Sequence, residues 1–489
     1  MIFSEKNLKY LLLGILILQG ILLAVSITGV PCHIDEAWMG EQSYREAQDG
    51  IPRQELLPGM YHFEERMLIR HKLFIFLGSL ATRVSGFSLY HLRLVSAAAG
   101  IALLGLLFLY QKREQERHHI LFLLTAVILM LCPLFFRYMK LYRPECLLAA
   151  FGFLSFFLLR RALDTRSIST AALSGIAAGL TVLTHLNGII FIASGAVLLL
   201  IMKRGKLFLV FSVVSLLSAS LYLYDIIGNY DLFRLQFFND FVVENTYSGA
   251  FAPVIRLFHE HQRYFRIPEI IGISLLFVVS LPVVFSRGTG ADRIMYGYTG
   301  LLIMFLGLVN KSLTAKYALP LFPFFALAAA SAVYVTVKGG TRLTSSKIYR
   351  GLLAIFLGLY VSYGLYYSVT TAFLNRVDTA GENAAVAVSM QPGTRVLAPG
   401  RFIYNEIGRF TIIDLLVPRY LATVRNKGEF NLTSLCEYAM KHAVDYIVVD
   451  DEYRKMGEID PRKIIPSVWG YSVEKTFSDG TILLKRFRQ

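Results

Sequence analysis

The chain has 489 residues, of which 55% are hydrophobic and 17% are charged, and its mean hydropathy is +0.53. A soluble protein of this length could not cover so much apolar side chain with polar surface, so the composition excludes an ordinary soluble enzyme and predicts a membrane protein. The formal net charge is +15. Because many basic residues stand in short loops between apolar runs, membrane topology explains this charge and no nucleic-acid partner is expected.

The first apolar run, Leu11–Val30, has the length of a membrane-spanning helix, about 20 residues. No small-residue cleavage site follows it, so we expect a helix that is retained rather than a signal peptide. Further apolar runs follow in the same manner. We expect helices at residues 10–30, 93–111, 120–137, 146–160, 168–184, 187–202, 207–224, 268–286, 294–310, 317–337 and 351–373, which makes eleven crossings.

Short basic segments set the expected topology. They are the N-terminus with Lys6 and Lys9, Lys112–His119, Arg160–Arg166, Lys203–Lys206, Arg287–Arg293 and Lys338–Arg350. If all of them face the cytoplasm, the N-terminus lies inside, the C-terminus lies outside, and Arg137–Glu145 is external. The segment 71–86 carries Lys72 and Arg83 and is short for a span, so we expect a helix at the outer interface there.

Two external loops are long, residues 31–92 and 225–267, and the second is rich in aromatic residues and arginine. Loops of this length in a compact protein are usually functional or disordered, and the aromatic content argues against disorder. The second loop contains Phe237, Phe238, Tyr247, Phe251, Arg256, Arg263 and Arg266.

The composition changes after about residue 376. Strand-like runs at 395–398, 410–415 and 446–449 alternate with polar or helical stretches such as 435–442, and a hairpin pattern at 472–477 and 481–487 ends the chain. We therefore expect residues 1–375 to form a membrane-embedded module and residues 376–489 to form a small α/β domain outside the membrane. No glycine-rich phosphate fingerprint opens a helix in that domain, so no nucleotide site is expected.

Two clusters of charged residues lie on the same expected side of the membrane. Asp35 and Glu36 follow the first helix, and Arg143 and Glu145 precede the fourth. The adjacent carboxylates are candidates for base or metal-binding work, although a solvated loop start would look the same. Glu145 stands at the mouth of an apolar helix, where ionisable groups are costly and are often functional.

With these clusters as its first elements, the chain resembles the GT-C membrane glycosyltransferases that use polyprenyl-phosphate sugars, such as protein O-mannosyltransferases and the transferase that adds aminoarabinose to lipid A. The matching segments, in order, are Asp35-Glu36, His71-Lys72-Leu73-Phe74, Leu92–Ala97, Arg143-Pro144-Glu145, Leu173–Gly175 with Gly179–Thr184, and Lys316–Pro323. There are departures. The family's prolines after the lysine are absent, Glu145 replaces the usual aspartate, and His185 stands where many members have lysine.

The resemblance implies a polytopic α-helical enzyme that moves a hexose or pentose from a polyprenyl phosphate to an acceptor hydroxyl, with inversion. The acceptor would be a glycan, a lipid or a protein, and the site would face the periplasmic side of the inner membrane. Asp35 is the expected base, with Glu36 beside it, because attack by a hydroxyl needs a positioned carboxylate. The residues expected to bind substrate are Lys72, Arg93, Arg143, Glu145, His185, Lys316 and Tyr317.

Two questions stay open at this stage. A divalent metal held by the oxygens of Asp35 and Glu145 is conceivable as a cofactor. A transporter or flippase for an anionic lipid or a lipid-linked sugar is the alternative function. Such a protein uses buried charges at the bilayer midplane and broken helices. Here the charges stand at helix ends and in one long loop, and no internal repeat is visible, which favours the transferase.

Overall fold

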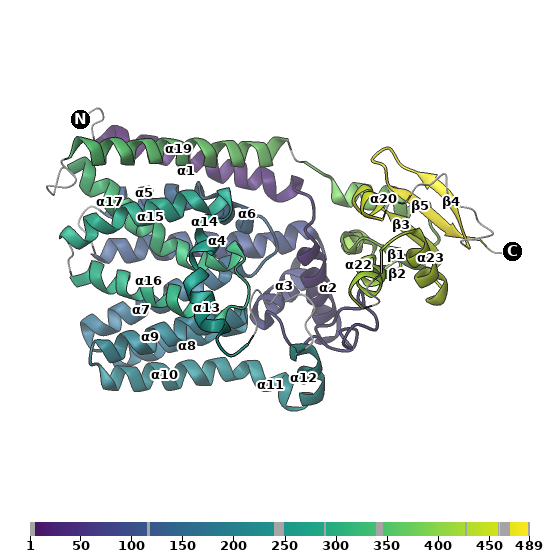
Figure 1. Cartoon of the computed structure of the whole chain (residues 1–489), viewed down its shortest axis with the longest axis horizontal. Coiled ribbons are helices and arrows are strands. Elements are labelled where there is room, and N and C mark those ends of the chain that lie inside the picture. Colours follow the sequence, from purple (N-terminus) through teal and green to yellow (C-terminus); the bar gives the residue numbers. More distant parts are fainter. Residues whose placement is uncertain are drawn as a thin grey trace.

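The structure is a computed structural model that describes residues 5–114, 118–238, 249–287, 290–338, 346–374, 376–425, 428–457, 459 and 470–487. Long helices run side by side in a bundle, and a small sheet lies beyond one end of it (Figure 1). Helices α2 (Ile34–Asp49) and α3 (Lys72–Ser85) lie between the bundle and the sheet. This arrangement confirms the predicted class, a helical membrane protein with a C-terminal α/β part.

Each of the eleven predicted membrane helices corresponds to helical structure. The elements are α1 (Glu5–Gly29), α4 (Leu89–Glu114), α5 (His118–Met130), α6 (Pro133–Met139), α7 (Glu145–Thr165), α8 (Ile168–Thr184), η1 (Leu186–Gly188), α9 (Ile189–Ile201), α10 (Gly205–Ser220), η2 (Leu221–Leu223), α15 (Pro268–Arg287), α16 (Gly290–Val309), η3 (Ala315–Leu321), α17 (Phe322–Lys338) and α19 (Lys347–Phe373).

Within the described ranges, six helices are long and apolar enough to cross a membrane, or up to eight if each of two bent pairs is one span. Three further apolar helices are shorter, namely Ile168–Thr184, Leu186–Ile201 and Arg293–Val309, which correspond to α8, to η1 with α9, and to most of α16. The number of eleven crossings therefore remains a prediction. Helix α3 has 14 residues and is not among the candidate spans, in keeping with the interface helix expected at 71–86.

The predicted helix 120–137 is broken. Pro133 stands at the first position of α6, and Cys132 before it is extended, because the proline ring disfavours helical backbone in the preceding residue. The two segments, His119–Met130 and Pro133–Met139, meet at 81°. The break therefore turns α6 away from the direction of α5.

The first external loop contains a helix that the sequence interpretation left as loop. Helix α2 begins with a capping box, in which the His33 side chain accepts from the Asp35 backbone and the Glu36 carboxylate accepts from the His33 backbone. Helix α3 packs closely on its neighbours at Gly78, where an added Cβ would collide with the Tyr142 hydroxyl.

The second external loop is also largely helical in its described part. It forms α11 (Tyr224–Ile227), α12 (Tyr230–Phe238), α13 (Ala252–His259) and α14 (His261–Phe265). Tyr247, which the sequence interpretation singled out, lies outside the described residues. Arg263 is buried and donates to Glu260 at 2.6 Å and to the Thr314 carbonyl at 3.1 Å, which ties this loop to the segment before η3.

The C-terminal part is a five-stranded sheet with the order β2-β1-β3-β5-β4. The strands are β1 (Arg395–Ala398), β2 (Thr411–Asp414), β3 (Tyr446–Val449), β4 (Tyr471–Thr476) and β5 (Ile482–Arg486). Strand β1 pairs in parallel with β2 and β3, and β5 pairs antiparallel with β3 and β4. The helical elements around it are α20 (Thr379–Ala387), η4 (Gly400–Phe402), α21 (Ile403–Glu406), α22 (Leu416–Tyr420), η5 (Leu421–Arg425), α23 (Leu432–Lys441) and α24 (Asp451–Met456).

This sheet contacts α2 through the segments that follow β1 and end β2. The Tyr404 hydroxyl donates to the Glu36 carbonyl at 2.7 Å, and the Trp38 indole donates to the Asp414 carboxylate at 3.0 Å. Gly40 faces Tyr404 so closely that a Cβ would collide with its hydroxyl. A domain boundary at residue 376 stays a prediction, but the sheet is in direct contact with the helix that begins at Ile34.

Topology can be tested with single cysteines in a background that lacks the four native ones. We expect a cysteine at His62, whose side chain is exposed before α3, to react with a membrane-impermeant thiol reagent in intact cells. A cysteine at Arg161, exposed near the end of α7, should react only after the membrane is permeabilised. Equal reaction of both cysteines in intact cells would contradict the proposed orientation.

Candidate active site

A cavity of about 550 Å³ opens at the end of the bundle that carries α2 and α12. Segments far apart in the sequence line it, namely the start of α2, the chain before α3, the chain before α7, the turn between α8 and α9, α12, and the segment 309–317. The lining residues include Asp35, Trp38, Gln42, Arg70, His71, Arg143, His185, Phe237, Lys311, Lys316 and Tyr317.

Asp35 supplies the acidic group of this lining. It stands in the first turn of α2 and its side chain is 18% exposed. Its carboxylate is in direct contact with the Arg143 guanidinium and lies 3.9 Å from the Lys316 ammonium. His33 is 3.8 Å away, but burial and the nearby Arg143 lower the pKa of His33 to about 4, so this imidazole is neutral. The positive charges next to the Asp35 carboxylate are therefore those of Arg143 and Lys316.

Arg143 lies between two carboxylates. One side of its guanidinium contacts Asp35, and the other side donates to the Glu145 carboxylate at 2.6 Å. The Glu145 side chain stands at the start of α7 and is only 1% exposed. The helix N-terminus stabilises a negative charge at that position. The backbone of Arg143 is fixed as well, because its N–H donates to the Ser96 hydroxyl and its carbonyl accepts from it. The guanidinium is thus rigidly placed at the cavity wall.

The expectation that Glu36 works beside Asp35 is not supported by its position. Glu36 is fully buried, does not line the cavity, and accepts four hydrogen bonds, from the Arg93 Nε and Nη2 at 2.8 Å and from the Tyr142 and His33 backbones. The other N–H groups of Arg93 donate to the backbone carbonyls of residues 27, 30 and 31. Both groups are saturated, so we reassign Glu36 and Arg93 from chemistry and substrate binding to holding the start of α2.

Lys72 also lies away from the cavity lining. Its ammonium donates to the Tyr222 carbonyl at 2.7 Å and to Asp225 at 3.2 Å, and burial lowers its pKa. Its neighbours Arg70 and His71 line the cavity instead. The sequence interpretation missed both of them, together with Trp38, Gln42 and Lys311. Most of these residues lie close in the sequence to Asp35, Lys72 or Lys316, and this proximity could have identified them as candidates.

His185 and Tyr317, both expected to bind substrate, are close together in the lining. The His185 ring lies 4.8 Å from the His71 ring and 5.5 Å from the Tyr317 ring, between centroids. Lys316 stands over the Tyr317 ring at 5.4 Å. The structure therefore brings together five predicted residues, Asp35, Arg143, His185, Lys316 and Tyr317, with Glu145 directly behind Arg143.

A metal does not fit the carboxylates considered for it. Among the residues that the structure describes, no group of three or more His, Cys, Asp or Glu is arranged to hold a metal ion. Asp35 and Glu145 both face the Arg143 guanidinium, which already supplies the positive charge between them. A metal cation added there would be repelled by the positive charges of Arg143 and Lys316, so these two carboxylates do not suit a metal.

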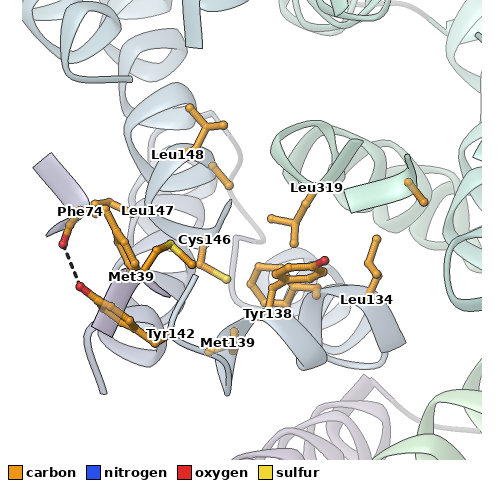
Figure 2. Close-up of a cluster of buried hydrophobic side chains, with 14 of the residues drawn as sticks. Met39, Phe74, Leu134, Tyr138, Met139, Tyr142, Cys146, Leu147, Leu148 and Leu319 are labelled. Carbon is orange, nitrogen blue, oxygen red and sulfur yellow. Dashed lines mark hydrogen bonds between the residues drawn. The ribbon is translucent and has the colours of Figure 1, made fainter. Parts of the chain in front are cut away.

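A cluster of buried hydrophobic side chains adjoins the cavity, because Met39 belongs to the cluster (Figure 2) and also lines the cavity. Figure 2 shows Met39, Tyr138, Met139, Tyr142, Cys146, Leu147 and Leu319 packed together, with the Tyr142 hydroxyl directed at the Phe74 carbonyl, 3.3 Å away. The same hydroxyl lies 2.7 Å from the Ser43 hydroxyl. These contacts lock α2, α3 and the segment after α6 together, so the charged groups stand on a packed base.

Comparisons with known proteins agree with this architecture. A family model for dolichyl-phosphate-mannose-protein mannosyltransferases matches residues 73–224. The crystal structure of ArnT from Cupriavidus metallidurans bound to undecaprenyl phosphate is similar with a TM-score of 0.67 at 12% identity, over 98% of each chain. Its apo form has a TM-score of 0.65 at 12% identity, over 96% of this chain and 97% of that one.

A more distant similarity is to the archaeal oligosaccharyltransferase AglB from Archaeoglobus fulgidus, in complex with an inhibitory peptide and a dolichol-phosphate. Its TM-score is 0.53 at 13% identity, over 90% of this chain and 69% of that one. No curated protein sequence matches the chain. The resemblance stated from the sequence is thus confirmed at the level of the fold, which is that of the GT-C glycosyltransferases, and the family model covers Arg93, Arg143, Glu145 and His185.

The reassignment of Glu36 predicts a loss of stability. Glu36→Gln leaves the Arg93 charge buried without its carboxylate, which typically destabilises a protein by about 3–5 kcal/mol. We expect a clearly lower thermal unfolding temperature in detergent. Glu65→Gln, which alters an exposed carboxylate of the same loop, is the matched control and should melt like the wild type. A Glu36→Gln protein with wild-type melting but no activity would restore a catalytic role.

Proposed function

We propose that this protein is a glycosyltransferase that moves a sugar from a polyprenyl phosphate to an acceptor hydroxyl at the outer face of the membrane, with inversion at the anomeric carbon. The observation that carries this proposal is the cavity in which Asp35, the one carboxylate among the described lining residues, stands among Arg70, Arg143, Lys311 and Lys316. A transferase of this kind needs one base and several cations in one place.

The cations suit the leaving group. When the glycosidic bond to phosphate breaks, its electron pair stays with a phosphate monoester, whose extra charge positive groups stabilise. Lys316 and Arg143 stand beside the carboxylate, and Arg70 and Lys311 extend the positive lining. The solved relative with the highest similarity quoted above contains undecaprenyl phosphate, which supports a lipid phosphate as donor here.

The carboxylate suits the attacking group. In an inverting transfer the acceptor oxygen attacks the anomeric carbon on the face opposite the phosphate, and its proton goes to a base. Asp35 is the acidic side chain among the described residues of the lining, and Glu145 is held behind Arg143 and orients that guanidinium. Tyr317 and His185, whose ring centroids are 5.5 Å apart, also line the cavity and take the role of substrate contacts.

The placement of the cavity at one bundle end suits a donor whose chain lies in the bilayer. Exposed aromatic side chains stand on α12, which lines the cavity, including Phe238 at 75% exposure. Aromatic side chains favour the headgroup zone of a membrane. We place this end, with the C-terminal sheet, on the periplasmic side of the inner membrane, where a glycan, lipid or protein acceptor is within reach.

Replacing the proposed base should abolish most turnover. General-base catalysis contributes about 10²–10⁴-fold, so Asp35→Asn should lower the release of free polyprenyl phosphate from a labelled lipid-linked sugar by at least about a hundredfold. Binding of the donor, measured separately by a lipid-protection assay, should persist.

Asp49→Asn is the matched control, because Asp49 is an exposed carboxylate at the other end of α2 that pairs with Arg53. It should keep near-normal turnover. If Asp35→Asn is as active as this control, the base is elsewhere and the assigned site is wrong.

Replacing a cation should act on the donor instead. A hydrogen bond to a charged group contributes about 1.5–3 kcal/mol, so Lys316→Met should lower kcat/KM for the donor by about 10- to 100-fold. Lys338→Met removes a lysine at the far end of α17 and serves as the control. Unchanged donor kinetics in Lys316→Met would exclude Lys316 as a phosphate contact.

A further inference from the structure

The cavity lining contains two histidines, His71 and His185, to which the proposed bond-breaking and bond-forming steps give no role. They come from different elements, His71 from the residue before α3 and His185 from the turn between α8 and α9. Their rings are 4.8 Å apart and both face the cavity that contains Asp35. Their shared position raises the question of which chemical groups of a ligand they bind.

The backbone fixes the tautomer of each ring. The Nδ1 of His71 lies 3.1 Å from the Thr184 carbonyl oxygen, and since a carbonyl can only accept, this Nδ1 carries the proton. The Nδ1 of His185 accepts the Asn187 backbone N–H at 3.0 Å, so this ring carries its proton on Nε2. The pair therefore offers one Nε2 acceptor and one Nε2–H donor.

Neither ring is poised to become a cation. Burial and the neighbouring Arg70 together lower the pKa of His71 to about 4. Burial also lowers the pKa of His185 well below its usual range, and His71 adds to the shift. Within the described part of the chain, no protein group forms a hydrogen bond with either Nε2. Both rings thus line the cavity as neutral polar groups, each with its Nδ1 bound to the backbone.

The backbone at His71 is strained in a way that suits a binding role. Its φ is 24°, a region that residues other than glycine rarely adopt. Such strain persists only where surrounding contacts enforce it, and it gathers at binding and catalytic sites. Here the Thr184 carbonyl and the start of α3 hold the ring in place.

The charges around the pair restrict the ligand further. The lining holds Arg70, Arg143, Lys311 and Lys316 against Asp35, and the second carboxylate, Glu145, is occupied by Arg143. Among the lining residues that the structure describes, a ligand ammonium would meet like charges and find no carboxylate that is not already paired, whereas a hydroxyl both donates and accepts and matches the two Nε2 groups.

We propose that His71 and His185 form a specificity site for a neutral sugar, in which one sugar hydroxyl donates to the Nε2 of His71 and one accepts from the Nε2–H of His185. This inference rests on the proposed transferase function and narrows its donor to uncharged hexoses or pentoses. Amino sugars are rejected by the positive lining. The two histidines are specificity residues and take no part in bond breaking.

The test uses the full-length purified protein and polyprenyl-phosphate donors that carry glucose, each monodeoxyglucose, arabinose, glucosamine or 4-amino-4-deoxyarabinose. Release of polyprenyl phosphate is measured for the wild type, His71→Phe and His185→Phe. Gln variants of both positions keep a polar atom near Nε2, and His62→Phe alters an exposed histidine as the control.

The wild type should favour each neutral donor over its amino counterpart by at least about tenfold, since 1.4 kcal/mol corresponds to tenfold. Loss of the recognised hydroxyl should lower kcat/KM by about three- to tenfold in the wild type and in His62→Phe. That penalty should vanish in the matching Phe variant and return in the Gln variant. A purely structural histidine would lower all donors alike and leave the penalty unchanged.

Two outcomes would overturn the specificity site while leaving the transferase proposal intact. One is equal use of amino and neutral donors by the wild type. The other is a loss of kcat/KM with the monodeoxy donors that is the same in both Phe variants as in the wild type. Release from none of the donors by the wild type would overturn the transferase proposal and this inference together.

Discussion

The ion pair between Glu36 and Arg93 is the constraint on which the site depends. Both side chains are almost completely inaccessible, and each of their hydrogen-bonding positions is filled. A buried pair is tolerable only when its geometry and hydrogen bonds repay the loss of water, and this one does so by linking the end of α1, the start of α2, α4 and the chain after α6. Asp35 precedes Glu36, so its place in the cavity follows from that anchor.

The same logic explains how a membrane-embedded bundle carries so many charges. Arg143 pairs with the carboxylates of Asp35 and Glu145, and Lys316 lies close to Asp35. Glu145 also stands at a helix N-terminus. Charges at membrane depth persist when they are paired at a helix end or a wet cavity. The C-terminal sheet adds a second support, because Tyr404 and Asp414 bind the outer side of α2 while the bundle binds the inner side.

Much of the architecture could be predicted from the sequence. Apolar runs located the long helices, and β1 and β3 have the same bounds as the predicted runs at 395–398 and 446–449. Helix α2 was missed because it is polar and packs between two layers, so it shows no apolar run. The break at Pro133 was missed because the apolar run continues through it and hides the bend.

The site was only partly predictable for a related reason. Motif order located Asp35, Arg143, Lys316 and His185, but it could not tell which of two adjacent side chains enters the cavity. Helix geometry places consecutive residues about 100° apart, so Asp35 lines the cavity while Glu36 is buried. Likewise, the chain before α3 presents Arg70 and His71, while Lys72 turns to Asp225.

The most direct test of the central claim is an experimental structure of the full chain in a lipid nanodisc with bound polyprenyl phosphate. We predict that the phosphate lies in the cavity beside Asp35, within hydrogen-bonding distance of Lys316 or Arg143, and that its chain leaves toward the exposed aromatic residues near α12. A phosphate bound at Lys72, at the C-terminal sheet or at the opposite end of the bundle would contradict the account.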